Sequence, residues 1–184
     1  APLVYAGDAS FYLMLSQGMI EHGTYLENAS LGAPFGQALY DLPHGNDNLN
    51  LAVIGVLGWI TGDAPTAINL FYLFTFFGVA TMAYLVARAL GISRAASLVV
   101  GLLYAFVPYH FARGTAHVLL SAYYLVPVAL WLIVRIASSR PPFLRERAAD
   151  EPARPGLRSL RWEWVPFLAC VGLASTGAYY ALMS

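Results

Sequence analysis

Asp8 is the residue of this sequence best placed to do chemistry. It lies in the segment Gly7-Asp8-Ala9-Ser10-Phe11-Tyr12, where an apolar stretch stops and a polar-faced helix is expected to begin. A carboxylate at such a point can take a proton from a hydroxyl group and act as a general base. It can equally be a helix N-cap, because an aspartate side chain accepts a hydrogen bond from an unpaired backbone N–H. The residue alone favours the cap, which is the commoner role.

A second group of polar side chains has the spacing of a possible metal site. Asp41, His44 and Asp47 follow one another at intervals of three residues. Carboxylate and imidazole groups are acceptable ligands for a divalent metal such as Mg²⁺ or Mn²⁺. The same residues would also serve as turn and cap residues around Gly45, and the sequence leaves both interpretations open.

The segment 108–117 supplies the complementary charge with His110, Arg113 and His117. The planar guanidinium of Arg113 can bind two phosphate oxygens at once, or it can extend to lipid head groups. The histidines either contact a substrate or are hydrogen-bonded at the membrane interface. Acids on one segment and His and Arg on the other suit a phosphate-bearing substrate. A base can activate an acceptor hydroxyl while a positive or metal-bound site stabilises the leaving phosphate.

Composition places these groups in a membrane protein. The 184 residues are 59% hydrophobic and 11% charged, well below the roughly 25% charged residues of a soluble domain. The single Cys170 excludes a disulfide framework and a cysteine-based metal site. The sequence has no Walker loop, Rossmann glycine fingerprint, HExxH or GxSxG motif. This argues against an ATP-driven pump, a dehydrogenase, a zinc protease and an α/β-hydrolase.

The hydrophobic pattern predicts an all-α polytopic membrane protein, a transmembrane helix bundle whose first outer loop contains short interfacial helices. The expected elements are a surface helix at 9–22, a loop at 24–47, a short non-crossing helix at 49–61, spans at 65–87, 93–109 and 117–136, and the start of another span at 163–184.

These elements group into four expected regions, and both ends of the chain look cut from a larger protein. The regions are the end of a first span plus an extracytoplasmic loop (1–63), three transmembrane helices (64–138), a cytoplasmic Arg-rich loop (139–161) and the start of a further span (162–184).

The arginines predict the orientation. Arg88 and Arg94 flank one short turn and seven arginines lie in 135–161, so both regions are expected in the cytoplasm. Asp8 and the segment 108–117 then lie on the extracytoplasmic face, provided that 49–61 does not cross. If 49–61 does cross, Asp8 is cytoplasmic, beside a segment that has no Lys or Arg.

With these features in order, the chain resembles the GT-C superfamily of polytopic glycosyltransferases. The resemblance rests on Gly7-Asp8 before the surface helix 9–22, the long outer loop with a second short helix, and the hairpins of spans. It also rests on Pro108-Tyr109-His110-Phe111-Ala112-Arg113-Gly114 and Tyr123-Tyr124-Leu125-Val126-Pro127, which resemble segments of bacterial GT-C-like membrane proteins.

The resemblance implies an inverting transfer of a sugar from a polyprenyl-phosphate donor to an acceptor, on the extracytoplasmic side of a bacterial plasma membrane. It implies that Asp8 is the base and that Arg113, with His110 or His117, holds the phosphate; Tyr12 joins them as a substrate-binding candidate. Many relatives have a second acid or a metal partner, and here the choice among Asp41, Asp47 and neither stays open.

The expected partners are the lipid-linked sugar donor and membrane lipids, and the oligomeric state is not predicted. Nucleic acid is not expected, because acids are interspersed in the Arg-rich loop and the loop is tethered at the bilayer. A non-enzymatic transporter or assembly factor for cell-surface polysaccharide is the alternative function. A channel or secondary transporter is disfavoured, because we find no inverted repeat and few polar residues within the spans.

Overall fold

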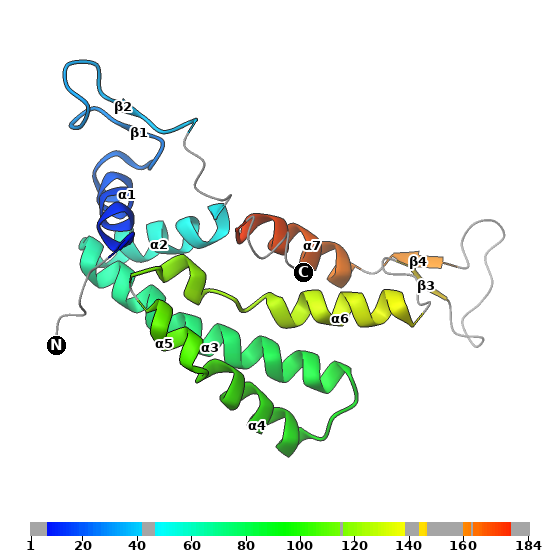
Figure 1. Cartoon of the computed structure of the whole chain (residues 1–184). Helices are drawn as coiled ribbons and strands as arrows, with labels where there is room; N and C mark the ends of the chain where they lie inside the picture. The colour runs from blue at the N-terminus through cyan, green and yellow to red at the C-terminus, as the bar shows by residue number, and fades with distance from the viewer. Residues whose placement is uncertain are drawn as a thin grey trace.

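The computed structural model describes residues 7–41, 47–114, 116–138, 144–146, 160–162 and 164–177, and this part of the chain is mainly helical (Figure 1). The helices are α1 (Ala9–His22), α2 (Asn48–Thr61), α3 (Ala64–Ala89), α4 (Arg94–Ala105), α5 (Pro108–Arg113), the 3₁₀ helix η1 (Val118–Ser121), α6 (Val126–Ala137) and α7 (Trp164–Ser175). The strands form two antiparallel pairs, β1 (Glu27–Asn28) with β2 (Gln37–Ala38) and β3 (Leu144–Glu146) with β4 (Leu160–Trp162).

Local signals explain where the first helices begin and end. The helix α1 ends at Gly23, which has a left-handed φ of 75° and donates its backbone N–H to the Met19 carbonyl. The long helix α3 begins at Asp63, whose carboxylate accepts the N–H of Thr66 at 2.8 Å. The predicted helices at 9–22, 49–61 and 65–87 are confirmed as helices.

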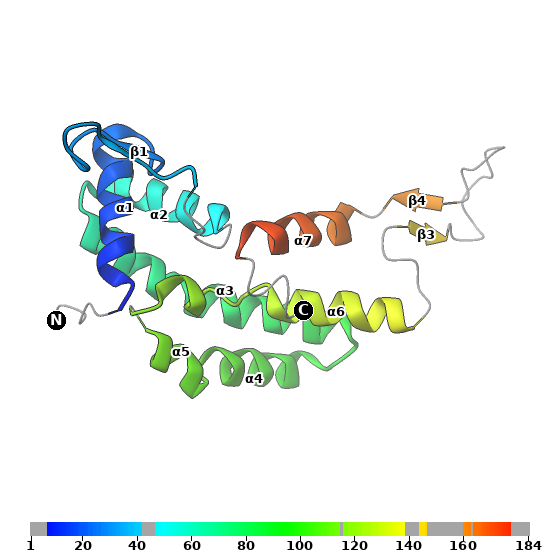
Figure 2. The same cartoon turned by 45° about the horizontal axis from the view of Figure 1, so that its top comes forward.

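The helix α3 is the centre of the arrangement, because α1, α2, α4, α6 and η1 all contact it. Figures 1 and 2 show α4 running back alongside α3 after a tight turn, while α1 and α2 lie near the start of α3. The largest buried cluster joins residues from three of these elements: Ile54, Ile68, Phe71, Tyr72, Val118, Leu119 and Ala122. This core holds η1, and the residues just before it, close to the first helices.

The prediction of one continuous helix at 117–136 is wrong. The chain forms η1, then a non-helical stretch at 122–125, and only then α6, with Pro127 in its first turn. Proline fits a first turn because it has no N–H to donate. The hydroxyls of Tyr123 and Tyr124 bond to Tyr104 O and Asn50 Oδ1 respectively, and these tertiary contacts compete with a helical path.

Two other predicted spans also differ from the structure. The expected helix 93–109 is interrupted at Phe106–Val107, where Pro108 begins α5 as a separate helix. The span expected at 163–184 is helical only over α7, because Thr176 and Gly177 are described and are not helical, and 178–184 lie outside the described residues. The predicted loop 139–161 contributes the β3–β4 pair, which the sequence did not reveal.

Two stretches within the described residues are long and apolar enough to cross a bilayer. They are Ala64–Ala89, with a mean hydropathy of 1.9, and Arg94–Arg113, with a mean hydropathy of 1.6, the latter counted through the break between α4 and α5. A crossing helix needs about 20 residues, so α2, α6 and α7 are apolar but shorter. The two stretches are identified by their length and composition alone.

Candidate functional site

The structure brings Asp8 and His117 together. Asp8 Oδ2 lies 2.8 Å from His117 Nδ1, although the residues are 109 positions apart. The backbone N–H of Asp8 also donates to the Ala116 carbonyl at 2.9 Å. Gly7 allows this approach, because it has a φ of 55° and an added Cβ would lie 3.1 Å from the same carbonyl oxygen. Side-chain and backbone contacts therefore fix the start of α1 against the segment before η1.

The Asp8 carboxylate does not cap α1. Asp8 is the residue before the helix and its carbonyl accepts the Tyr12 N–H, but its side chain makes no capping hydrogen bond. The carboxylate is directed to His117 instead. The Asp8 side chain is 56% exposed and that of His117 is 36% exposed, so a ligand in solvent can reach both.

The Asp8–His117 pair can accept a proton from a hydroxyl group. When neutral His117 donates its Nδ1–H to Asp8, its Nε2 is a hydrogen-bond acceptor, and the carboxylate keeps a second oxygen. Either atom is suited to act as a general base. A contact as exposed as this one contributes little to stability, so the pair is distinguished by what it can do chemically and not by its contribution to the fold.

His110, which was predicted to bind substrate, is part of the core. It is completely buried, with Nε2 at 3.0 Å from Thr75 Oγ1 and Nδ1 at 3.1 Å from the Tyr123 hydroxyl. Its ring centroid lies 3.8 Å from that of Phe76. Of the two interpretations of this residue, the geometry favours a hydrogen-bonded structural histidine and gives it no access to a ligand.

Arg113 ends α5 and is half-buried. Its guanidinium carbon lies 5.2 Å from the centroid of the Tyr109 ring, a cation–π contact. No acidic side chain of the described residues lies within ion-pair distance of it. The backbone N–H of His117 donates to the Arg113 carbonyl at 3.1 Å, so the backbones of Arg113 and His117 are neighbours.

Tyr12 follows Asp8 by one turn of α1 and is half-buried. Its ring meets Phe11 edge-on, with centroids 5.6 Å apart, and packs against the core residues of α2 and α3. This packing is sufficient to explain an aromatic residue at position 12, so Tyr12 contributes less to the candidate site than its position in sequence suggested.

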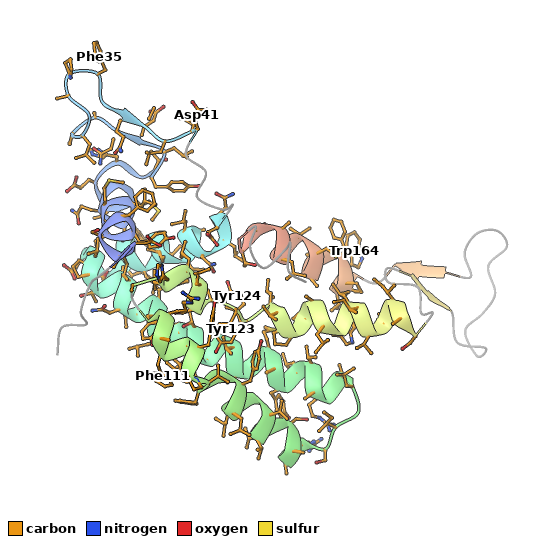
Figure 3. The ribbon with its side chains drawn as sticks, in the orientation of Figure 1. Phe35, Asp41, Phe111, Tyr123, Tyr124 and Trp164 are labelled. Atoms are coloured by element: carbon orange, nitrogen blue, oxygen red, sulfur yellow. The ribbon has the colours of Figure 1, made fainter. Side chains whose placement is uncertain are left out.

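The predicted metal ligands do not form a recognisable metal centre. His44 lies outside the described residues, and no three His, Cys, Asp or Glu side chains of the described part of the chain could together hold a metal ion. Asp41 is exposed beside the β1–β2 pair, far from Tyr123 and Tyr124 in Figure 3. Asp47 is 8% exposed, and an added Cβ on Gly177 would lie 2.6 Å from its Oδ1. Asp41 is exposed and Asp47 is buried, so the described residues do not support a metal site that the two share.

The sequence identified Asp47 as a candidate ligand, but it did not predict that this carboxylate is buried. Burial raises its pKa to about 7, and the nearby Asn50 side chain opposes part of this rise. Asn50 is fully buried, and its Oδ1 accepts the Tyr124 hydroxyl at 2.7 Å. A single Asn inside the apolar stretch 49–61 was the available signal, because buried amides need partners.

No protein-family profile, no curated protein and no solved structure matches this chain.

Proposed function

We propose that this chain is part of an integral membrane glycosyltransferase of the GT-C type. It would move a sugar from a polyprenyl-phosphate donor to a hydroxyl acceptor on the extracytoplasmic face of a bacterial plasma membrane. The observation that carries the proposal is the accessible pairing of Asp8 with His117 at 2.8 Å. The Asp8 carboxylate caps no helix and lies beside a histidine from a distant segment. Such a pair can act as a general base.

In this mechanism the acceptor hydroxyl gives its proton to the Asp8–His117 pair as its oxygen attacks the anomeric carbon of the sugar. The bond between that carbon and the phosphate oxygen breaks, and the polyprenyl phosphate leaves with the bonding electrons. Attack opposite to the leaving group inverts the anomeric centre. Arg113 would bind the phosphate oxygens, since it is close in the chain to His117 and has no acidic partner among the described residues.

Two observations support the membrane location and the orientation. The stretches Ala64–Ala89 and Arg94–Arg113 have the length and hydropathy of spans, and the turn between them is flanked by Arg88 and Arg94. By the positive-inside rule this turn is cytoplasmic. The other end of the α3–α4 hairpin, where α5 leads to His117, is then extracytoplasmic.

The test compares the cell-surface glycans and glycolipids of strains that carry the full-length gene with Asp8→Asn, with His117→Gln or without change, and of a deletion strain. Loss of a general base lowers a rate by about 10²–10⁴-fold, so both variants are expected to reproduce the deletion profile at matched membrane levels. Asp41→Asn, which alters an exposed aspartate elsewhere, is the matched control and should behave as wild type.

If deletion changes the glycan profile and Asp8→Asn does not, the carboxylate is not required for chemistry. The protein would then be a transporter or an assembly factor for surface polysaccharide.

A further inference from the structure

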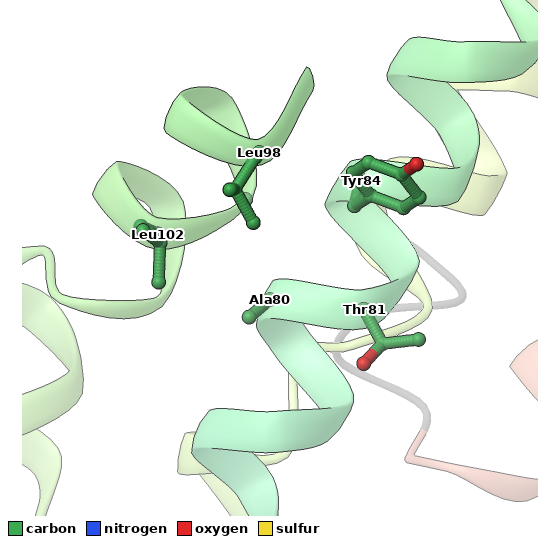
Figure 4. A pocket seen from close by; sticks show the side chains of 6 residues that line it. Ala80, Thr81, Tyr84, Leu98 and Leu102 are labelled. Atoms are coloured by element: carbon green, nitrogen blue, oxygen red, sulfur yellow. The ribbon is translucent and has the colours of Figure 1, made fainter. Parts of the chain in front are cut away.

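A groove runs between α3 and α4 on the part of the hairpin nearest the α3–α4 turn (Figure 4). It is lined by Ala80, Thr81, Tyr84, Leu98, Gly101 and Leu102. Its volume is about 230 Å³, below the roughly 300–1,000 Å³ of pockets that enclose drug-sized ligands. The groove is therefore too small for a lipid-linked sugar head group, but its mainly apolar lining suits part of a hydrocarbon chain.

Close helix packing creates the groove. A Cβ added to Gly101 would lie 2.6 Å from the Ala80 carbonyl oxygen, so the two helix backbones meet at this glycine, as small residues allow in membrane helices. Figure 4 shows Leu98 and Leu102 of α4 facing Ala80 of α3 across the groove. Its surface is almost entirely apolar, which leaves a polar ligand without hydrogen-bond partners and suits methylene groups.

Positive charge lies at one end of this apolar surface. Arg88 follows Tyr84 by one turn of α3, and Arg94 precedes Leu98 by one turn of α4. Both flank the α3–α4 turn, where the Arg88 guanidinium donates to the Ile92 carbonyl. No acidic side chain of the described residues is within ion-pair distance of either arginine. The groove thus ends beside two cations whose charge the described protein does not neutralise.

We propose that the α3–α4 groove binds one acyl chain of an anionic phospholipid, whose phosphate lies at Arg88 and Arg94. The apolar groove matches the chain and the two arginines match the head group. This inference requires α3 and α4 to lie in a bilayer, but it does not depend on any transferase activity. The lipid-linked donor is not the occupant, because its phosphate must reach the Asp8–His117 pair. Asp8 directly precedes α1, and α1 lies near the start of α3, away from the α3–α4 turn (Figure 1).

The test measures lipid binding to the purified full-length protein in detergent. Phosphatidylglycerol and phosphatidylcholine with the same acyl chains are titrated separately, and binding is followed by the rise in Tm and by native mass spectrometry. An arginine near the membrane surface contributes about fivefold to the binding of an anionic lipid. Arg88→Gln with Arg94→Gln is therefore expected to weaken phosphatidylglycerol binding about 25-fold. Phosphatidylcholine binding should weaken less, because the choline cation offsets the charge of its phosphate.

A second variant tests the groove rather than the charges. Thr81→Phe places a ring in the groove from its exposed rim and is expected to weaken the binding of both lipids, with Leu102→Trp as an independent way to fill it. Arg135→Gln is the matched control, because it removes an arginine from the end of α6 and should leave binding intact.

Three outcomes would overturn the proposal. Equal affinity for the two lipids would remove the role of the arginines. If both groove-filling variants keep the wild-type Tm in the absence of lipid and still bind the two lipids as the wild type does, the lipid site lies elsewhere. Displacement of phosphatidylglycerol by an equimolar polyprenyl phosphate, at the wild-type groove but not at the filled one, would assign the groove to the donor lipid.

Discussion

Asp47→Asn is expected to remove a pH dependence of stability that the fold builds into this position. Asp47 is 8% exposed, and burial raises its pKa from the ordinary value of 3.8 to about 7. The folded protein therefore holds a proton on Asp47 at pH values where the unfolded chain has released it. A group of this kind stabilises the folded state most at low pH, and that stability is lost as the pH rises from about 4 to about 7.

The magnitude follows from the same pKa values. Each pKa unit corresponds to about 1.4 kcal/mol, so Asp47 costs the folded state at most about 4 kcal/mol above pH 7, relative to its contribution in acid. Most of this change, about 3 kcal/mol, falls between pH 5 and pH 8. For a chain of this size, 1 kcal/mol moves Tm by about 2–4 °C, so the effect is large enough to measure.

The assay is thermal unfolding of wild type and Asp47→Asn in detergent at pH 5 and pH 8, followed by tryptophan fluorescence. All other ionisable groups are common to the two proteins, so the difference between the two pH responses isolates Asp47. We expect the wild type to lose stability relative to the variant as the pH rises. Asp41→Asn, at an exposed aspartate, should leave the wild-type response unchanged. If Asp47→Asn and wild type respond identically to pH, Asp47 is not held in an apolar environment and the reasoning is refuted.

Two further substitutions test the N-cap of α3 and the close contact between α3 and α4. Asp63→Ala removes the hydrogen bond that the carboxylate accepts from the Thr66 N–H at 2.8 Å, and it should lower Tm by about 2–4 °C. Asp63→Asn should retain the wild-type Tm, because asparagine caps a helix equally well. Equal Tm values for all three proteins would exclude capping by this residue. Gly101→Leu should lower Tm, because any Cβ at position 101 would lie 2.6 Å from the Ala80 carbonyl oxygen. Leu103→Ala, a change at an exposed position of the same helix, should lower Tm less. A larger loss of Tm for Leu103→Ala would show that α3 and α4 are not in close contact at Gly101.

Local features of the sequence were sufficient to predict several elements. Gly23 sets the end of α1 and Asp63 the start of α3, because caps act on backbone groups a few residues away. The apolar run at 64–89 also predicts a helix of membrane length, because length and hydropathy can be read directly from the sequence. The residues Asp8 and His117 were also identified by type, since carboxylate and imidazole chemistry is visible in the sequence.

The contacts between distant segments were decided by the tertiary structure. The sequence could not choose between a capping and a histidine-bonded Asp8, because that choice depends on a backbone 109 residues away. Nor could it show that His110 is buried against Phe76. The break near Tyr123 and Tyr124 has the same origin, since their hydroxyls find partners on other helices. Helix periodicity and capping act over a few residues, whereas packing decides which distant side chains meet and which lose contact with solvent.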